Sequence, residues 1–516
     1  MCKVRIFLLR ASAKTIVGSQ WQPVVLCAVM FGVFSYLQPY WLDTLLFQNI
    51  LHRCCPDGLS VQGFVAFVAD VASFDNARLF NLMAPLIADY LPKWLDGALV
   101  GFMAALLFWA IGRLAGLRRS DGSLWWLLLA IFFIVLPWHN NLLVPDYSLN
   151  YIYTSALSLA VVVVALHGSR ASAAVAAVLA VVAGWGLQGI GGTLLAGAVG
   201  MMLAVGQFRR YGVLYAVSAL ATAAGAAAFF ATHLTERLAY EVTLPWIIEN
   251  MPTWLLFNCF TAGLVVLVAL MALTRKGRRR MAAFVDANPL SVYFFAVAVA
   301  TMALSGMLAR SYRVTFWPQV CAIVVWGMVL LPFLRRHGRA VRVLAVSGAV
   351  CVIFIFGNEA TLGARCRKIS DDAMAQLEQP ETLTAYVPLL HPAEYQLMLR
   401  RFAPAHMFVY PPHIYFLREY FGRHVAIVPR ELRHVDTSIA PDSLCFTAGG
   451  IGYFRPSEPK VTYDYKWLPI TTRGRRTFTA RVYYCDYIAP DGTPMTWVQP
   501  IDIVPDSVAA IGDIVY

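Results

Sequence analysis

The stretch that decides how this chain is organised reads WLDTLLFQNILHRCC from Trp41 to Cys55 and FDNARLFNLMAPLIADYLPKWLDG from Phe74 to Gly97. It is partly polar, lies between two apolar runs, and holds more carboxylates than any other segment between such runs. A chain this hydrophobic has little reason to keep so long a segment out of a bilayer unless the segment has a task. We therefore expect residues 43–96 to form a large first loop that carries the chemistry.

Composition indicates a membrane protein. Of the 516 residues, 59% are hydrophobic and 14% are charged, against about 25% charged in soluble domains. The mean hydropathy is +0.62, and apolar runs approach the ~20 residues that cross a bilayer. The net charge of +12 sits in short clusters between these runs, as the positive-inside rule expects. This distribution argues against a nucleic-acid partner.

The apolar runs predict a polytopic α-helical protein of about eleven transmembrane helices. Basic residues ahead of Trp21 favour a cytoplasmic N-terminus (1–21) and a retained signal anchor over a cleaved signal peptide. The expected spans fill a transmembrane domain over 22–357, at 22–42, 97–116, 123–138, 152–167, 171–187, 191–207, 213–232, 254–273, 290–309, 317–334 and 343–357.

Charge bias sets the expected orientation. Every second loop is basic, for example at Arg118-Arg119, Arg209-Arg210 and the cluster from Arg275 to Arg280. The intervening loops hold far fewer Lys and Arg, so we expect them outside. The Gly-rich junction from Gly184 to Gly192 allows either close helix packing or a re-entrant hairpin. The basic loops on both sides favour two ordinary spans.

Residues 358–516 differ in character, with more Pro, Tyr and charge and strand-like runs such as HVAIVP, FTARVYYCDYIA and WVQPIDIV. They predict a mixed α/β extracytoplasmic domain. In an oxidising compartment Cys445 and Cys485 can pair, with Cys366 as a competing partner. The expected location is the plasma (inner) membrane, with the C-terminal domain periplasmic.

Several motifs are absent from the sequence: a Walker loop, GxGxxG, HExxH and paired CxxC. Their absence weakens ATP-driven transport, dinucleotide chemistry and zinc proteolysis. No spacing of residues predicts a metal site. The carboxylates of the first loop leave a divalent metal ion open as a cofactor.

Two carboxylates of the first loop are candidates for a general base. Asp43 directly follows the first span and its aromatic residues, where a carboxylate can accept a proton or simply end a helix in the headgroup zone. Asp75 is followed by Asn76 and Arg78, whose guanidinium suits a phosphate or carboxylate. The alternative for this group is a helix cap with a surface ion pair.

Two further outward loops supply candidate binding residues. Asp146, Tyr147, Asn150 and Tyr151 lie at the mouth of the fourth span, with the amides and rings that a sugar site uses, although Tyr also favours bilayer interfaces. Arg310 and Arg313 run against the positive-inside bias, which favours an anionic partner such as a lipid phosphate. The remaining candidate, Gln188, needs a polar partner within its apolar surroundings, either a ligand or a neighbouring helix.

At these residues the chain resembles bacterial polytopic sugar transferases of the GT-C class, close to O-antigen glucosyltransferase-type membrane proteins. The resemblance covers the layout of residues 20–357 with loose motifs: Asp43 after the first span, NARLFN (76–81), SLNYIY (148–153), Arg313 before a late span, and a C-terminal outer domain. Such enzymes transfer a sugar from a polyprenyl-phosphate-linked donor to a glycan or lipid acceptor in the cell envelope, often during polysaccharide synthesis.

The resemblance implies a role for several residues. Asp43 would be the base, Arg313 would hold the donor phosphate, and Asn150 and Tyr151 would line the sugar pocket. Two departures are visible: relatives often have a second acidic residue after the first, where this chain has Thr44, and often an acidic residue where it has Gln188. These departures leave open a changed acceptor, Asp75 as the base, or lost catalysis.

Two other function classes compete with the transferase. A flippase for lipid-linked glycans or a secondary transporter would favour charged or broken helices at the midplane, whereas the apolar runs here are nearly free of ionisable groups. A non-catalytic membrane assembly protein would leave the long acidic first loop without a purpose. Sequence therefore favours surface chemistry, with membrane lipids, the donor and the acceptor as partners.

Overall fold

The computed structural model describes residues 20–40, 42–74, 78–138, 142–231, 251–252, 254–308, 312–388, 411–434, 444–448, 451–454, 464–472, 477–500, 508–511 and 514–515. Three predicted site residues, Asp75, Asn76 and Arg310, lie outside the described residues. The backbone of Gln188 is described, and its side chain is not.

The chain divides into two compact units. Unit 1 contains Met1–Tyr36 and Asp57–Asn358, and unit 2 contains Leu37–Pro56 and Glu359–Tyr516. Unit 2 is therefore built from two segments far apart in sequence, one from the predicted first loop and one from the predicted C-terminal domain. The division between the units falls inside a single long helix, α18 (Gly338–Leu377).

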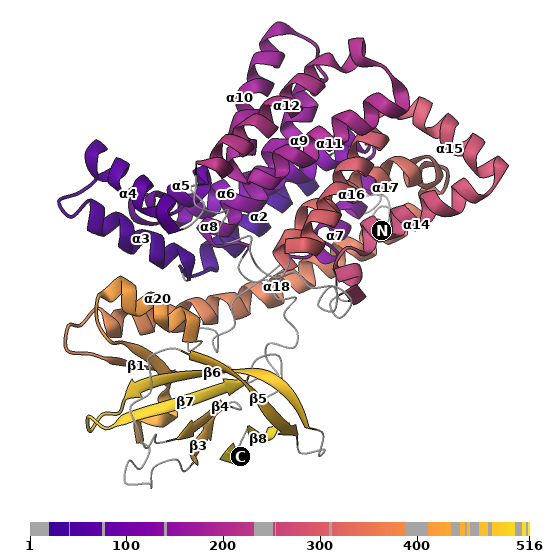
Figure 1. Cartoon of the computed structure of the whole chain (residues 1–516). Helices are drawn as coiled ribbons and strands as arrows, with labels where there is room; N and C mark the ends of the chain where they lie inside the picture. The colour runs from indigo at the N-terminus through magenta and orange to yellow at the C-terminus, as the bar shows by residue number, and fades with distance from the viewer. Residues whose placement is uncertain are drawn as a thin grey trace, which may run out of the picture. The chain divides into compact units, whose positions relative to one another are not determined.

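Unit 1 is helical (Figure 1). Apolar residues fill most of these helices. A helix that is apolar on every side is expected in a protein core or in a membrane. In chain order its elements are α2 (Trp21–Leu37), α4 (Val61–Phe74), α5 (Leu79–Tyr90), α6 (Lys93–Leu114), α7 (Gly122–Ile134), α8 (Pro145–Tyr147), the π-helix η1 (Ser148–Tyr153), α9 (Thr154–Ala165), α10 (Arg170–Gly186), α11 (Gln188–Val205), α12 (Phe208–Phe230), α14 (Cys259–Leu273), α15 (Arg275–Ala287), α16 (Leu290–Leu308), the 3-10 helix η3 (Tyr312–Thr315), α17 (Phe316–Arg336) and the first part of α18.

Several helices have the length and composition of membrane spans. Within the described residues, five are long and apolar enough to cross a bilayer, and a sixth is counted if α15 and α16, which bend by 106° at their junction, form one span. The chain thus has the features of a multi-pass membrane protein. Each of the eleven predicted spans coincides with a helix, but several of these helices have only 10–17 residues. A straight crossing needs about 20, so the number eleven stays a prediction.

Small residues bring three of these helices together. A side chain at Gly184 or Gly191 would collide with the backbone carbonyl of Ala221 in α12. Without a Cβ, α10 and α11 can both approach α12 closely. The two helices are separate and break at Leu187, whose φ and ψ are extended.

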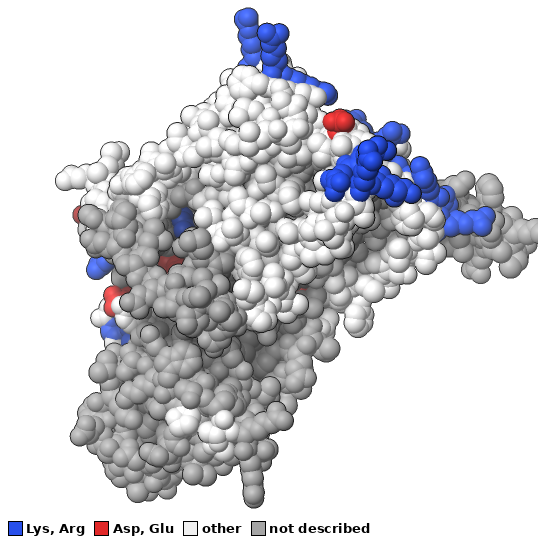
Figure 2. Space-filling model, turned by 45° about the vertical axis from the view of Figure 1, so that its right-hand side comes forward, with Lys and Arg blue, Asp and Glu red and all other residues white. Residues whose placement is uncertain are grey.

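Residues expected to form loops are largely helical. Loop residues 43–96 contain α3 (Asp43–Cys54), α4 and α5. The basic cluster after Leu273 forms α15, an amphipathic helix whose Arg275, Lys276 and Arg278 are exposed. Basic side chains gather in the upper right of the view in Figure 2. A helix with one strongly basic face is typical of the membrane interface.

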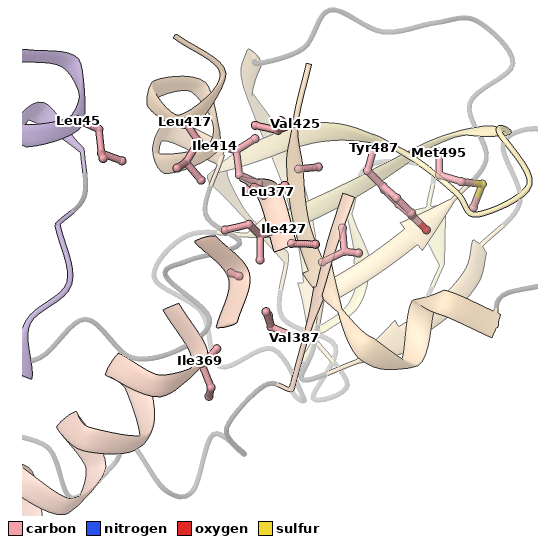
Figure 3. Close-up of a cluster of buried hydrophobic side chains, with 14 of the residues drawn as sticks. Leu45, Ile369, Leu377, Val387, Ile414, Leu417, Val425, Ile427, Tyr487 and Met495 are labelled. Atoms are coloured by element: carbon pink, nitrogen blue, oxygen red, sulfur yellow. The ribbon is translucent and has the colours of Figure 1, made fainter. Parts of the chain in front are cut away.

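Unit 2 has a hydrophobic core shared by helices and strands. Here β1 (Thr384–Val387) pairs in parallel with β2 (Ala426–Pro429), and α20 (Pro411–Phe421) lies between them in sequence and packs on β2. Figure 3 shows Ile414 and Leu417 of α20 near Ile427 of β2, and Val387 of β1 and Leu45 of α3 belong to the same cluster. Helix α3 packs on α20, which explains why this loop segment belongs to unit 2. The 3-10 helix η5 (Arg430–His434) follows β2.

The remaining strands form an antiparallel sheet in the order β3-β4-β7-β6-β5-β8-β9. Of the strand-like runs of the sequence, HVAIVP falls in β2 and FTARVYYCDYIA in β6, while WVQP of the third run lies in β7 and its IDIV (501–504) lies outside the described residues. Their bounds are β3 (Leu444–Ala448), β4 (Ile451–Phe454), β5 (Asp464–Thr472), β6 (Thr477–Ile488), β7 (Pro494–Pro500), β8 (Val508–Ile511) and β9 (Ile514–Val515).

The order of the strands bears on the expected Cys445–Cys485 disulfide. Cys485 pairs with Trp497, Trp497 with Tyr453, and Tyr453 with Phe446, the neighbour of Cys445. Three steps between strands separate the two α-carbons by about 14 Å at roughly 4.8 Å per step. A disulfide needs less than about 7 Å, so this sheet argues against the pairing.

Candidate functional site

Buried and half-buried polar side chains of unit 1 gather where α5, α6 and the α8–η1 segment begin. Helix α5 contacts α8 and η1, and α6 contacts η1. We call the following residues the polar cluster: Arg78, Asn81, Lys93, Asp96, Asp146, Tyr147, Asn150, Tyr151 and Arg313. Of these, Asp96 and Asp146 are each only 2% exposed. Burying a carboxylate costs free energy unless it is paired or hydrogen-bonded. Two buried carboxylates in one region therefore make this cluster a candidate functional site.

Asn150 lies at the centre of the cluster. It is 4% exposed, and its Nδ2 donates to Asn81 Oδ1 at 2.5 Å and to the backbone carbonyl of Asp146 at 2.6 Å. These two bonds tie η1 to α5 and to α8. Asn150 occupies a π-helical turn, a local widening of the helix that is frequent at functional sites.

The orientation of the Asn150 amide follows from its partners. A carbonyl oxygen only accepts, so the atom that faces the Asp146 carbonyl must be the nitrogen. The other atom, Oδ1, is buried and has no hydrogen-bond partner among the described residues. Such an acceptor costs about 1–3 kcal/mol when unsatisfied, and a ligand hydroxyl would satisfy it.

A cation–π contact joins the late part of the chain to this region. The Arg313 Cζ lies 4.1 Å from the centre of the Tyr147 ring. Arg313 is half-buried in η3, and Tyr147 is 7% exposed in α8. Stacking on the ring fixes the guanidinium plane, and its N–H groups suit a bidentate anion.

The beginning of α6 contributes an ion pair that the sequence reading missed. Lys93 Nζ lies 2.8 Å from Asp96 Oδ2, and their side chains are 12% and 2% exposed. The pair occupies the first turn of α6 after Pro92, where a carboxylate is favoured by the helix dipole. Its structural explanation is sufficient, so we assign it no substrate.

Arg78 occupies the N-cap position of α5, where its side chain makes no capping hydrogen bond, and it is half-buried. Its Nε is buried and has no hydrogen-bond partner among the described residues. A guanidinium carries five donors, so a buried donor left open is a place for an anionic or polar ligand to bind. Arg78 thus remains a candidate, now without the neighbours Asp75 and Asn76, which lie outside the described residues.

Close packing next to the polar cluster explains one glycine of the Gly184–Gly192 junction. A side chain at Gly186 would meet the Phe80 ring and Thr154 Oγ1. Gly186 therefore allows α10 to approach both α5 and α9. On the next helix, Thr193 Oγ1 accepts a hydrogen bond of 3.3 Å from Trp317 Nε1, which links α11 to the beginning of α17.

Asp43 lies in unit 2, whereas the polar cluster lies in unit 1. It is half-buried at the first position of α3, after Leu42, whose φ of 51° is the one positive value outside glycine among the described residues. Backbone strain of this kind often accompanies functional sites. The first turn of a helix also favours a carboxylate for purely structural reasons.

Sequence reading missed several buried polar groups. Asn81 was visible only as part of NARLFN, and Asp96 lies just before the expected beginning of a span. Glu359, in α18 within unit 2, is 0% exposed. In the sequence, each of these residues is visible only as a carboxylate or amide near an apolar run. Many residues share that feature, and only the structure shows which of them are buried. Within the described ranges, no three His, Cys, Asp or Glu side chains come together as a metal site.

Comparison with known proteins gives no family for the chain. No protein-family model matches it, and no curated protein matches it significantly.

Proposed function

We propose that this chain is a membrane glycosyltransferase that moves a sugar from a polyprenyl-phosphate-linked donor to a glycan or lipid acceptor at the outer membrane face. One observation carries the proposal. The buried polar cluster lies at the beginnings of α5, α6 and α8–η1, while the interiors of α6, α9, α10 and α11 carry no Asp, Glu, Lys or Arg. Polar groups concentrated at one end of apolar helices suit a reaction at headgroup depth.

The residues have separable roles in this proposal. Arg313, stacked on Tyr147, binds the donor phosphate, and Arg78 provides further donors. The open Oδ1 of Asn150 accepts a hydrogen bond from a sugar hydroxyl, and Tyr151 lines the same region. Two guanidinium groups near a leaving phosphate stabilise its charge as it departs.

The proposed reaction is a substitution at the anomeric carbon. The acceptor hydroxyl oxygen forms the new bond, the bond between that carbon and the phosphate oxygen breaks, and polyprenyl phosphate leaves with the electron pair. A carboxylate takes the hydroxyl proton. The resemblance to GT-C enzymes implies Asp43 for this role, and within the polar cluster the buried Asp146 is the carboxylate nearest in sequence to Asn150.

A transporter is a weaker fit to the same residues. Translocation across the membrane favours ionisable groups or broken helices at the midplane. Here the break at Leu187 lies between Gly186 and Gly191, which allow close helix packing because each lacks a side chain. The cluster therefore favours surface chemistry.

The test is sugar transfer by the purified full chain from a panel of polyprenyl-phosphate sugars. We expect Asp43→Asn to reduce transfer by at least about 100-fold if Asp43 is the base, and Arg313→Gln to raise the KM for the donor.

Asp57→Asn and Arg339→Gln, both exposed and outside the cluster, are the matched controls. Loss in Asp146→Asn with an active Asp43→Asn moves the base to Asp146. Absence of transfer by the unaltered chain with every donor overturns the proposal and favours translocation or assembly.

A further inference from the structure

A second polar region lies at the other end of α6. A cavity of about 190 Å³ is lined by Gln20, Trp21, Trp109, Arg113, Arg119 and His167. These residues come from the beginning of α2, the last turns of α6, the loop after it and the end of α9. The 22 residues of α6 span about 33 Å at 1.5 Å per residue, close to the hydrocarbon thickness of a bilayer. The cavity and the polar cluster therefore lie at opposite ends of a helix long enough to cross a bilayer.

The cavity carries positive charge that no described carboxylate balances. Arg113 Nη1 donates only to the backbone carbonyl of Leu117, at 3.4 Å, and Arg119 has no ion pair among the described residues. The nearby Asp121 is already engaged, because its Oδ2 lies 2.6 Å from Arg335 Nη2 and 2.9 Å from the Arg118 amide. Two guanidinium groups at one cavity suit a phosphate.

Two further groups refine the chemistry of the ligand. His167 Nδ1 lies 2.9 Å from the Val163 carbonyl and must donate to it, which leaves Nε2 for a ligand. Gln20 is 2% exposed, and its Oε1 has no hydrogen-bond partner in the described part of the chain. An open acceptor next to two cations suits a ligand that combines a phosphate with a hydrogen-bond donor.

The aromatic residues favour a lipid over a soluble anion. Trp21 is 55% exposed and Trp109 is half-buried at the cavity wall. Trp is enriched at headgroup level because its ring is apolar and its N–H is polar. Basic pockets between membrane helices bind anionic headgroups by the same physics.

We propose that this cavity binds the headgroup of an anionic phospholipid, with Arg113 and Arg119 on the phosphate and Gln20 accepting from a headgroup hydroxyl. Phosphatidylglycerol combines these features and is the probe. The site is separate from the polar cluster and does not depend on the proposed sugar transfer.

The experiment counts bound lipid on the purified full chain by native mass spectrometry, titrating phosphatidylglycerol against phosphatidylcholine. The double variant Arg113→Gln/Arg119→Gln should bind phosphatidylglycerol at least 10-fold more weakly. The matched control, Arg279→Gln/Arg280→Gln in α15, removes the same charge from exposed positions and should stay within about twofold of the unaltered chain. Equal losses in both, or loss in neither, overturn the proposal.

Two further arms keep the result decisive. Gln20→Leu should reduce the preference for phosphatidylglycerol while leaving both arginines in place, so it tests the site even if the double variant does not fold. Inorganic phosphate is then added as a competitor. Displacement of the lipid by equimolar inorganic phosphate would assign the cavity to a free anion and overturn the lipid proposal.

Discussion

The Asn81–Asn150 contact provides the sharpest test at the scale of single residues. Each single Ala substitution should lower the free energy of unfolding by about 1–3 kcal/mol, because it leaves a buried partner unsatisfied. The double variant should lose less than the sum, with a coupling energy of about 0.5–3 kcal/mol. Thermal unfolding in detergent measures all three. Additive losses would mean that the two amides do not interact.

His413 should make the stability of unit 2 depend on pH. Burial lowers the pKa of this imidazole to about 3, whereas an unfolded chain keeps about 6.5. Between these values the unfolded state binds the additional proton, so the free energy of unfolding falls as the pH falls from about 6.5 towards 3, by up to about 1.4 kcal/mol per pH unit.

Unfolding of the full chain at several pH values, followed by a probe in unit 2, checks this expectation. His413→Gln should flatten the dependence in that window. His434→Gln, at an exposed position, should leave it in place. An unchanged slope in His413→Gln would contradict the assignment.

The sequence indicated which residues of the site are functional candidates, but it did not indicate which residues they contact. Asn150 stood out because an amide preceded an apolar run, and Arg313 because it opposed the charge bias. Asn81 lies 69 positions from Asn150, and no pattern in one sequence connects the two. The hydrogen bond depends on how α5 packs on η1, which is set by many apolar contacts at once.

At the scale of elements, the glycines of α10 and α11 can be ranked by what surrounds them. Gly184→Ala should destabilise the chain by about 1–3 kcal/mol, because the new Cβ would collide with the Ala221 carbonyl. Gly189→Ala and Gly192→Ala meet no atom within 4 Å, and each should be neutral or stabilise by up to about 1 kcal/mol. Melting temperatures of the three variants compare them directly. Equal effects would show that α10 and α12 do not pack here.

Helices and strands that show a single strong sequence pattern could be predicted. Long apolar runs became helices, and β-branched runs fell in β2, β6 and β7. Helices α3 and α15 fall in predicted loops, because charge and hydropathy locate membrane spans but do not mark the short helices between them, whereas α5 matches the helix that the cap alternative at Asp75–Arg78 predicts. The π-turn of η1 had no visible cause in SLNYIY.

At the scale of the whole molecule, orientation remains a prediction with a direct test. Single cysteines at exposed positions 119 and 279 should react with a membrane-impermeant maleimide only after the membrane is opened. One at position 491, in the C-terminal domain, should react in intact cells. The basic positions follow the positive-inside rule. The same reactivity at all three positions would overturn the proposed arrangement of an odd number of spans.

Sequence separated residues 22–357 from 358–516 by composition, and the structure divides α18 after Asn358. It did not assign residues 37–56 to the second unit. That assignment depends on contacts between α3 and α20, which are long-range and leave no local signature.

The two-segment construction of unit 2 has a consequence for the order of synthesis. Helix α3 leaves the ribosome about 360 residues before α20, a delay of roughly 18–70 s at 5–20 residues per second. During that time Leu45 of α3 lacks the hydrophobic cluster that Ile414 and Leu417 of α20 later join. The core of unit 2 can therefore close only after α20 has been synthesised, late in translation.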